Sequence, residues 1–229
     1  MSRIIAIDGP SGSGKSSVSK IVGAKLGFLH VDSGALYRIV TWRCLEEGVD
    51  TSDPAAIAAF SRKVEIETTP KGGEAAYTTR GEDPGERIRT PEVNAHASLV
   101  AREKPVRDKI TALLRSMTRF GDLVVEGRDI TTAVFPDAVA RFFLTASAEA
   151  RAARRRKEEL EKGIADESVE AVKKSLLARD AIDSTRKHAP LKKADGVVEI
   201  DSSDLTLDET VQAVLDALPA EWTAGARSN

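Results

Sequence analysis

Short apolar runs recur along the chain and alternate with segments in which apolar residues recur at helical spacing. Continuous apolar runs of strand length are typical of strands that are covered on both faces of a parallel sheet. Alternation of such strands with helices is the pattern of α/β proteins. We therefore predict a five-stranded parallel sheet with helices on both faces, with strands at residues 3–8, 28–31, 121–126, 140–145 and 196–201.

The intervening segments have the apolar spacing of helices. Asp32 or Ser33 can cap the second helix and Asp204 or Thr206 the last, because such side chains accept hydrogen bonds from first-turn N–H groups. We expect the polar tail after Pro219 to be frayed. The predicted helices cover residues 17–26, 35–47, 55–62, 90–99, 104–120, 147–162, 166–183 and 205–218.

A different pattern interrupts this alternation between the second and third strands. Residues 64–68 alternate polar and apolar side chains, and residues 75–79 read as a returning strand after the turn at 71–73. This pattern predicts a small antiparallel β insertion at about residues 64–90. Its simplest interpretation is a surface hairpin without a function of its own.

A glycine-rich loop, Gly9-Pro10-Ser11-Gly12-Ser13-Gly14-Lys15-Ser16, joins the first strand to the first helix. The spacing is that of a phosphate-binding loop, and strand, loop, helix is the context that the motif requires. Gly12 and Gly14 let polyphosphate approach the backbone N–H groups. Lys15 can reach the β- and γ-phosphates, and the Ser16 hydroxyl can ligate Mg²⁺. The alternative is a Gly/Ser-rich turn that binds nothing.

Composition limits the range of functions. The 229 residues include 34 Lys and Arg and 36 Asp and Glu, for a net charge of −2, so charge does not favour a nucleic-acid partner. Cys44 is the only cysteine, which excludes an intramolecular disulfide and a Cys-based zinc cluster. Without a signal peptide or an apolar run of about 18 residues, the chain is expected to be cytoplasmic and away from membranes. We also expect a monomer, because no predicted helix has an unexplained apolar face.

Polar side chains lie at the end of the strand at 121–126, in the stretch Glu126-Gly127-Arg128-Asp129. Ligands of open parallel sheets bind at the carboxyl ends of strands, which favours a site here. Alternatively, Arg128 and Asp129 form a structural ion pair. Arg107 lies in the first turn of a predicted helix, where a cation opposes the helix dipole, and a nearby anionic ligand would remove that conflict.

Two highly charged helices follow the fourth strand, on either side of Gly163. The first carries five basic residues, which are Arg151, Arg154, Arg155, Arg156 and Lys157. In the second, Arg179 and Asp183 share one face with Arg186 if the helix continues that far. Charge runs usually form a solvated face. In a phosphate-loop fold, they also suit a mobile lid whose arginines close over the transferring phosphates.

Phosphate-binding loops occur in GTPases, ATP-driven motors and small kinases. GTPases read guanine with an Asn/Thr-Lys-x-Asp stretch, but the two asparagines, Asn94 and Asn229, lie in no such stretch. Motor domains usually need a longer chain and a strand that ends in an acidic pair. A small-molecule kinase needs an acceptor pocket and a lid. The Arg-rich segments can supply both, because the guanidinium group binds phosphate oxygens bidentately.

The chain resembles the bacterial-type cytidylate kinases, which are P-loop nucleoside monophosphate kinases. The stretch Asp32-Ser33-Gly34-Ala35-Leu36-Tyr37-Arg38 and the β insertion carry this resemblance more specifically than the phosphate loop does. The likeness covers nearly the whole chain up to the final helix. The other matching stretches are residues 7–15, 88–93, 127–129, 134–138 and 179–191.

The resemblance implies transfer of the γ-phosphate of ATP to CMP or dCMP, with Mg²⁺ as cofactor. It implies a single kinase domain over residues 1–229, with an acceptor-binding segment at 33–105 and a lid at 148–187. Ser16 would hold Mg²⁺ together with waters. The residues implied for catalysis are Lys15, Arg128, Arg154, Arg155 and Arg179, and those for ATP binding are Gly9, Pro10, Ser11, Gly12, Ser13, Gly14, Lys15, Ser16 and Ser17.

The resemblance also implies an acceptor site. Asp183 would contact the sugar. The phosphate would lie near Ser33, Arg38, Arg128 and Arg186, the cytosine near Ser98, Arg107 and Asp129, and the lid arginines Arg154, Arg155 and Arg179 would face the phosphates of ATP. The full set implied for CMP is Ser33, Tyr37, Arg38, Ser98, Arg107, Arg128, Asp129, Arg179, Asp183 and Arg186.

One position departs from the family pattern, which often has Asp before Gly-Arg-Asp where this chain has Glu126. A longer carboxylate can shift the water shell of Mg²⁺, so Glu126 receives no role from the resemblance. Two other functions stay open at this point. One is a kinase for another acceptor, such as a different nucleoside monophosphate or a shikimate-like acid, and the other is a non-catalytic ATP-binding switch. The intact Lys15 and Ser16 and the two basic helices argue against the switch.

Overall fold

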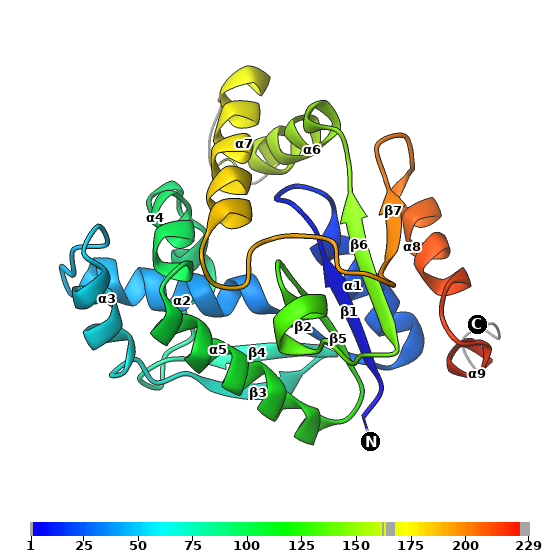
Figure 1. The fold of residues 1–229 in the computed structure, drawn as a ribbon, viewed down its shortest axis with the longest axis horizontal. Helices are drawn as coiled ribbons and strands as arrows, with labels where there is room; N and C mark the ends of the chain where they lie inside the picture. The colour runs from blue at the N-terminus through cyan, green and yellow to red at the C-terminus, as the bar shows by residue number, and fades with distance from the viewer. Residues whose placement is uncertain (1, 162, 164–167, 225–229) are drawn as a thin grey trace.

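The described part of the chain, residues 2–161, 163 and 168–224 of a computed structural model, contains one sheet of seven strands (Figure 1). Its order is β3-β4-β2-β5-β1-β6-β7. Neighbours among the last five strands in this order pair in parallel, which confirms the predicted five-stranded core. The strands are β1 (Ile4–Asp8), β2 (Leu29–Asp32), β3 (Glu67–Lys71), β4 (Glu74–Thr78), β5 (Leu123–Gly127), β6 (Ala140–Thr145) and β7 (Val198–Asp201).

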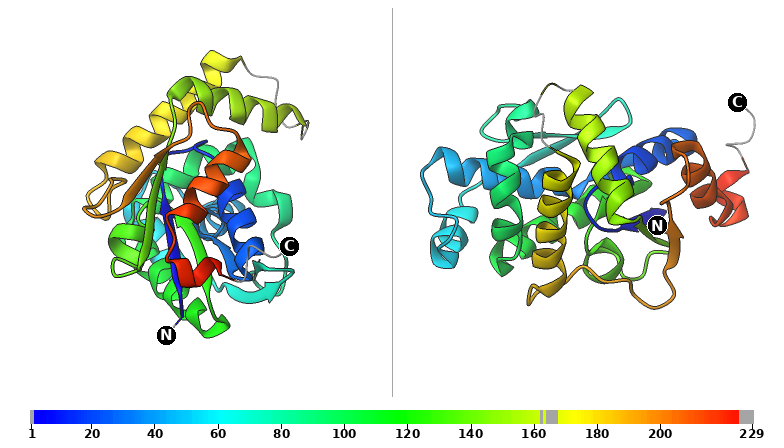
Figure 2. Two further views of the ribbon diagram at one scale, coloured as in Figure 1. Left: turned by 90° about the vertical axis from the view of Figure 1, so that its right-hand side faces the viewer. Right: turned by 90° about the horizontal axis from the view of Figure 1, so that it is seen from above.

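Helices cover both faces of the sheet, as predicted (Figures 1 and 2). In β1, Ile4 and Ala6 pack into the core with α2 and α5, whereas Ile5 and Ile7 pack into the core with α1 and α8. This double burial explains the continuous apolar run of that strand. The helices are α1 (Lys15–Leu26), α2 (Ser33–Glu46), α3 (Pro54–Ser61), α4 (Pro91–Ala101), α5 (Lys104–Ser116), α6 (Ala148–Glu161), α7 (Val169–Thr185), α8 (Leu207–Asp216) and α9 (Ala220–Thr223).

The β insertion is part of the main sheet, because β4 pairs in parallel with β2 at His30 and Glu74. Its two strands pair antiparallel as predicted, but the first one lies at Glu67–Lys71 rather than at 64–68. Val64 is buried in the core, and this burial produced the alternation that the sequence shows. The left-handed Gly72 and Gly73 form the two-residue turn, which sets Lys71 opposite Glu74 and moves the pairing toward the turn.

Most predicted helix ends lie within two residues of the observed ones, and three predictions need separate comment. The helix expected at 104–120 ends at Ser116 and continues as a 3₁₀ turn at Met117–Phe120. The expected start at Asp166 lies outside the described residues, and α7 begins at Val169 behind the cap Ser168. The prediction of a frayed tail is wrong for α9, in which Trp222 packs against Phe28 with ring centroids 6.0 Å apart. Residues 225–229 lie outside the described part of the chain.

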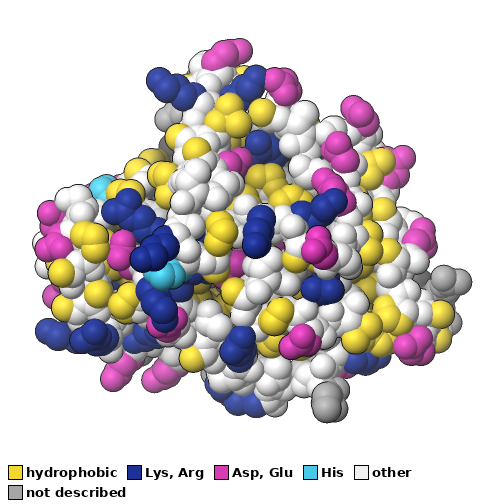
Figure 3. Space-filling model, in the orientation of Figure 1, with side chains coloured by type: hydrophobic (Ala, Val, Ile, Leu, Met, Phe, Trp, Pro, Cys, Tyr) yellow, Lys and Arg dark blue, Asp and Glu magenta, His cyan; other side chains and the backbone are white. Residues whose placement is uncertain are grey.

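The parallel strands bring the candidate site residues to one edge of the sheet. Asp8, at the end of β1, is in register with Gly127 of β5, and Asp32, at the end of β2, is in register with Glu126. Helices α6 and α7 lie above this edge (Figure 1). Basic and acidic side chains are interspersed on the face shown in Figure 3. Among the described residues, no helix is both long and apolar enough to cross a membrane.

Candidate active site

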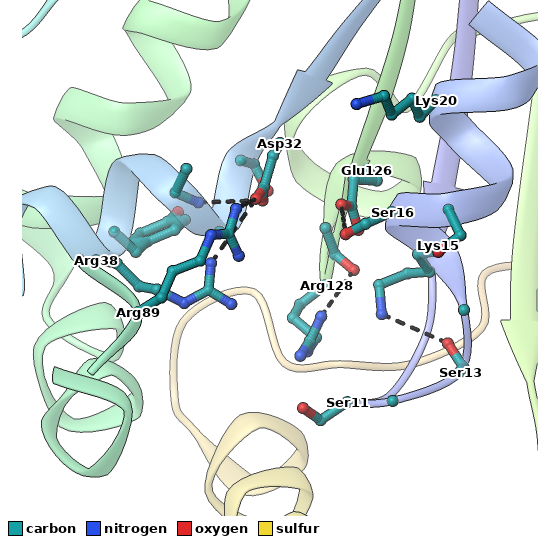
Figure 4. Close-up of a pocket in the computed structure, with 18 of the residues that line it drawn as sticks. Ser11, Ser13, Lys15, Ser16, Lys20, Asp32, Arg38, Arg89, Glu126 and Arg128 are labelled. Carbon is teal, nitrogen blue, oxygen red and sulfur yellow. Dashed lines mark hydrogen bonds and ion pairs between the residues drawn. The ribbon is translucent and has the colours of Figure 1, made fainter. Parts of the chain in front are cut away.

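The phosphate-binding loop lies between β1 and α1, as the motif predicts. Gly9 is required by close packing, because a Cβ at this position would lie 2.0 Å from the carbonyl oxygen of Leu144. Gly14 caps α1 in the left-handed conformation, with φ of 90°. The Nζ atom of Lys15 folds back and donates to the carbonyl oxygen of Pro10 at 2.7 Å. The same atom lies 3.5 Å from the Oγ atom of Ser13 (Figure 4). The loop is thereby wrapped around a space at the N-terminus of α1.

That space suits an anion. The backbone N–H groups of Gly12, Ser13 and Gly14 have no hydrogen-bond partner among the described residues. Together with the positive end of the α1 dipole, these N–H groups form the kind of cradle that binds phosphate. Burial and, to a smaller extent, the positive charge of Arg128 lower the pKa of Lys15 to about 7. A phosphate anion beside Lys15 would favour its charged form again.

Ser16 and Glu126 meet at the base of the loop. The Ser16 hydroxyl donates to the Oε1 atom of Glu126 (Figure 4). Hydroxyl and carboxylate oxygens are ligands that suit Mg²⁺, and this ion usually takes its remaining ligands from water and substrate phosphates. The donor set therefore fits the metal. Glu126, to which the sequence assigned no role, is the acidic residue that contacts the predicted Mg²⁺ ligand.

A second cluster contains three arginines, Arg38, Arg128 and Arg179, whose charges act on one another. Burial and then the charges of Arg38 and Arg128 lower the pKa of Arg179 to about 10. Burial also lowers the pKa of Arg38, and the side chains of Arg89 and Arg128 lower it further while Asp32 opposes them. Arginines lower each other's pKa in this way where their charges lie close together. The buried Nη1 of Arg38 and Nε of Arg179 have no hydrogen-bond partner among the described residues, so this cluster has donors free for an anion.

Asp32 supports the same cluster and was not selected from the sequence as a site residue. Its Oδ1 atom accepts from the N–H of Ala35 and caps α2, which resolves the choice between Asp32 and Ser33. Its Oδ2 atom accepts from Nη2 of Arg89 at 3.1 Å and lies 3.8 Å from Nη1 of Arg38 (Figure 4). Arg89 is likewise an addition to the predicted set. The sequence indicated Arg89 only through its place in the matching stretch 88–93. No periodic pattern could show that its partner is Asp32.

A third cluster is deeply buried and pairs opposite charges. Arg107 donates to Asp129 Oδ2 and, at 2.9 Å, to the carbonyl oxygen of Ala101. Arg186 reaches the other oxygen of Asp129 at 3.5 Å. Arg128 pairs with Asp183 at 3.2 Å rather than with its neighbour Asp129, so the alternative of an Arg128–Asp129 ion pair is wrong. The anion that offsets the dipole conflict of Arg107 is therefore Asp129 itself.

Arg154 and Arg155, two of the three predicted lid arginines, have different partners. Arg154 on α6 donates to the Oγ atom of Ser202 at 3.0 Å and to the carbonyl oxygen of Ser202, in the loop after β7. Arg155 pairs with Glu158 and Glu159 on its own helix. Arg179 instead joins Arg38 and Arg128. The geometry therefore separates the three residues, and the prediction that all three face the phosphates of ATP stays a prediction.

One cavity of about 940 Å³ connects these clusters. Its wall runs from the phosphate-binding loop to Ser33 and Arg38, and on to Ser98. A Cβ at Gly127 in this wall would lie 2.5 Å from Ser33 Oγ and 2.8 Å from Cδ1 of Ile130, so a larger residue would displace these side chains. The cavity brings together the predicted site residues Ser11, Gly12, Ser13, Gly14, Lys15, Ser16, Ser17, Ser33, Tyr37, Arg38, Ser98, Arg128, Asp129, Arg154, Arg155, Arg179, Asp183 and Arg186, whereas Gly9, Pro10 and Arg107 lie behind its surface.

Comparison with known proteins identifies the family. The sequence profile of the family described as cytidylate kinase matches residues 5–220. The chain belongs to the cytidylate kinase family. A family member from Streptomyces avermitilis is 48% identical over 214 residues, which cover 93% of this chain and 90% of that one. Another from Shouchella clausii is 43% identical over 212 residues, covering 93% and 94% of the two chains.

Solved structures agree on the fold alone. The crystal structure of an uncharacterized protein from Eubacterium ventriosum superposes with a TM-score of 0.50 at 11% identity, covering 94% of this chain and 97% of that chain. At this identity the likeness carries no information on substrates. The predicted family is confirmed by sequence, and the predicted α/β class by the sheet itself.

Proposed function

We propose that the protein is a nucleoside monophosphate kinase that transfers the γ-phosphate of ATP to CMP and dCMP. The observation that carries this proposal is the single cavity that joins the phosphate-binding loop to a separate cluster of arginines at Arg38, Arg128 and Arg179. Two neighbouring anion sites in one cavity suit a phosphoryl donor and a phosphorylated acceptor. Membership of the cytidylate kinase family supports the choice of acceptor.

The reaction needs alignment more than acid–base chemistry. A nucleotide phosphate is already a competent nucleophile at neutral pH, so the protein does not need a strong general base. The arginine cluster would hold the acceptor phosphate in line with the γ-phosphate, while Lys15 offsets the charge that develops on the transferring group. Exclusion of water by the lid would prevent hydrolysis of ATP.

We assign the metal to the base of the loop. Ser16 would ligate Mg²⁺ directly, and Glu126 would hold its waters, because their side chains already meet there. Bound Mg²⁺ supplies charge neutralisation for the transferring phosphoryl group in kinases of this kind. Glu126 thereby takes the position that Asp often occupies in the family.

We assign recognition of the base to the buried charged cluster. Cytosine presents an amino donor next to ring and carbonyl acceptors. The guanidinium of Arg107 and the carboxylate of Asp129 supply the complementary donor and acceptor, and Ser98 lies in the same cavity wall. Asp183 and Arg186, which extend this cluster, would contact the sugar and the phosphate region. Another base would leave the buried Arg107 or Asp129 without a hydrogen-bond partner, and this cost would make the site specific for cytosine.

We further propose that the chain is one kinase domain with an acceptor segment at 33–105 and a lid at 148–187, part of which lies outside the described residues. We expect it to act as a monomer in the cytoplasm, on small nucleotides rather than on nucleic acid. Light scattering after gel filtration would test the oligomeric state. A dimer at micromolar protein concentration would contradict this part of the proposal.

The function itself is tested by an assay of ADP release coupled to an indicator enzyme. The acceptors compared are CMP, dCMP, UMP, AMP and shikimate, each at saturating ATP. We expect CMP and dCMP to give the highest kcat/KM. A higher kcat/KM with AMP or shikimate would replace the acceptor, and an absence of turnover with every acceptor would support the non-catalytic switch.

A further inference from the structure

Asp180 of α7 is bonded to the phosphate-binding loop. Its Oδ1 atom accepts a hydrogen bond from the Ser11 N–H at 2.9 Å. Its Oδ2 atom pairs with Nη1 of Arg151 on α6. Arg151 also donates to the carbonyl oxygen of Ser11 at 2.9 Å and to that of Ala146 at 3.1 Å. Three segments, the loop, α6 and α7, are thus joined by one closed set of bonds.

These bonds hold the outer edge of the loop and leave its phosphate-facing side open. They satisfy the N–H and C=O groups of Ser11, whereas the N–H groups of Gly12 to Gly14 keep no partner among the described residues. The bond to Asp180 therefore leaves the N–H groups of Gly12 to Gly14 available for a phosphate. Helices α6 and α7 also pack closely on Gly12 of the loop. A Cβ on Gly12 would lie 3.2 Å from Cβ of Arg151 on α6 and 3.5 Å from Cδ1 of Leu176 on α7. The lid helices rest on the loop itself.

Helix α7 also carries the residues of the acceptor end. Arg179, adjacent to Asp180, lies with the arginine cluster, and Asp183 pairs with Arg128. Arg186, the residue after the helix, reaches Asp129. Helix α7 and the residue that caps it therefore contact the donor loop through Asp180 and the acceptor pocket through the other three residues.

We propose that Asp180, held by Arg151, is a positioning residue that fixes the phosphate-binding loop to α7 and so aligns the donor phosphates with the acceptor. This inference rests on the proposed kinase function. The largely buried carboxylate does not need to touch either nucleotide for this role. A displacement of about 1 Å between reacting groups can lower a rate by about 100-fold, so loss of the link should affect turnover more than binding.

The test compares Asp180→Ala, Asp180→Asn and Glu149→Gln in the full chain. Glu149 is the matched control, because its pair with Lys173 also joins α6 to α7 but is exposed and does not contact the loop. The readouts are kcat and KM for ATP and CMP, circular dichroism, and hydrogen exchange of the Ser11 amide measured by NMR. The exchange readout does not depend on activity, so it separates this inference from the proposed function.

We expect Asp180→Ala to lower kcat by about tenfold or more while each KM changes by less than about threefold. Its Ser11 amide should exchange faster than in the wild type, because the acceptor is gone. Asp180→Asn keeps an oxygen for that N–H and should retain more of both properties, and Glu149→Gln should match the wild type. A folded Asp180→Ala variant with unchanged Ser11 exchange or with wild-type kcat would overturn the inference. If the alanine variant does not fold, an Asp180→Asn variant with faster Ser11 exchange and wild-type kcat would overturn it equally. A wild-type protein inactive on CMP would contradict the proposed function, and faster Ser11 exchange in the alanine variant would still support the link.

Discussion

The Ser16 hydroxyl donates a hydrogen bond to the carboxylate of Glu126, which joins the first turn of α1 to the end of β5. The two residues are far apart in the sequence, and adjacent parallel strands bring them together at the edge of the sheet. A carboxylate beside the predicted Mg²⁺ ligand can orient the waters of the metal as well as the hydroxyl.

We predict that Glu126→Gln lowers kcat by about 10- to 100-fold, because the amide removes the negative charge that holds the metal and its waters. Glu126→Asp should keep most of the activity, since the family often has Asp at this position. Both are measured by steady-state kinetics over a range of Mg²⁺ concentrations. Equal activity of the Gln variant and the wild type at every Mg²⁺ concentration would leave Glu126 as a structural partner of Ser16 alone.

Lys15 should gain a proton when ATP binds. Burial, with the charge of Arg128, lowers its pKa to about 7 in the free protein, so at pH 8 most of these amines are neutral. The phosphates would raise that pKa, and binding should therefore take up a proton from the buffer. Titration calorimetry at pH 8 in phosphate and in Tris, which differ in ionisation enthalpy, measures the number of protons. Lys15→Met should show less uptake, and identical heats in the two buffers for the wild type would contradict the shift.

The sequence predicted the sheet core well because buried parallel strands leave continuous apolar runs. Residues 140–145 coincide with β6 as observed. The first strand of the hairpin was predicted too early because Val64 is buried but pairs with no strand in the described part of the chain. The sequence pattern reports burial, and burial alone does not show whether a residue belongs to a strand. Thr206 caps α8 and was one of the two caps predicted for this helix, because capping depends on nearby residues. The reciprocal bond from Glu209, which completes a capping box, was not predicted.

The site was only partly predictable, for a related reason. A phosphate-binding loop is contiguous, so the motif located Lys15 and Ser16 directly. The pairing of Arg107 with Asp129 joins two segments whose register no sequence periodicity encodes. Asp180 is the clearest omission. Its partner Ser11 lies 169 residues away, and beside Arg179 it resembles an ordinary helix charge.

Asp129 should control recognition of CMP. Replacement by Ala removes the carboxylate that Arg107 and Arg186 share, so we expect KM for CMP to rise by about 10-fold or more and KM for ATP by less than about threefold. The same change leaves two buried cations without this partner and should destabilise the fold by about 3–5 kcal/mol. Urea unfolding measures that cost separately. Asp108→Asn, at an exposed ion pair on α5, is the control, and equal shifts of the two KM values would argue against base recognition by Asp129.

Arg154 and Arg155 should affect turnover without determining the fold. Both line the cavity, although one is bonded to Ser202 and the other to acidic residues of its own helix. We expect the double alanine variant to lose at least about tenfold in kcat, because the two cations that we propose to face the phosphates of ATP are removed. Far-UV circular dichroism should be unchanged. Lys173→Ala on α7 serves as the control, and a double variant with normal kcat would leave the two arginines as surface charges.

Asp8 should make the stability of the protein depend on pH. Burial raises its pKa to about 6, although hydrogen bonds from Thr131 and Ile130 oppose the shift. Between the usual pKa of 3.8 and about 6, the folded state keeps a proton that the unfolded state has lost. The contribution of Asp8 to the free energy of unfolding therefore falls as pH rises through this window, by about 3 kcal/mol, and is constant above it.

Urea unfolding of the wild type and Asp8→Asn at pH 4, 5, 6 and 7 measures this contribution, because the other titrating groups cancel in the difference between the two proteins. The free energy of unfolding of the wild type minus that of the variant should decrease from pH 4 to pH 6 and then stay level. Asp122→Asn is the control, because the pKa of Asp122 is shifted in the opposite direction to that of Asp8. Hydrogen bonds from Arg3, which outweigh the effect of burial, lower the pKa of Asp122, so the corresponding difference should increase as pH rises from below that pKa to about 4. A difference for Asp8 that does not change with pH would show that its carboxylate keeps an ordinary pKa in the folded protein.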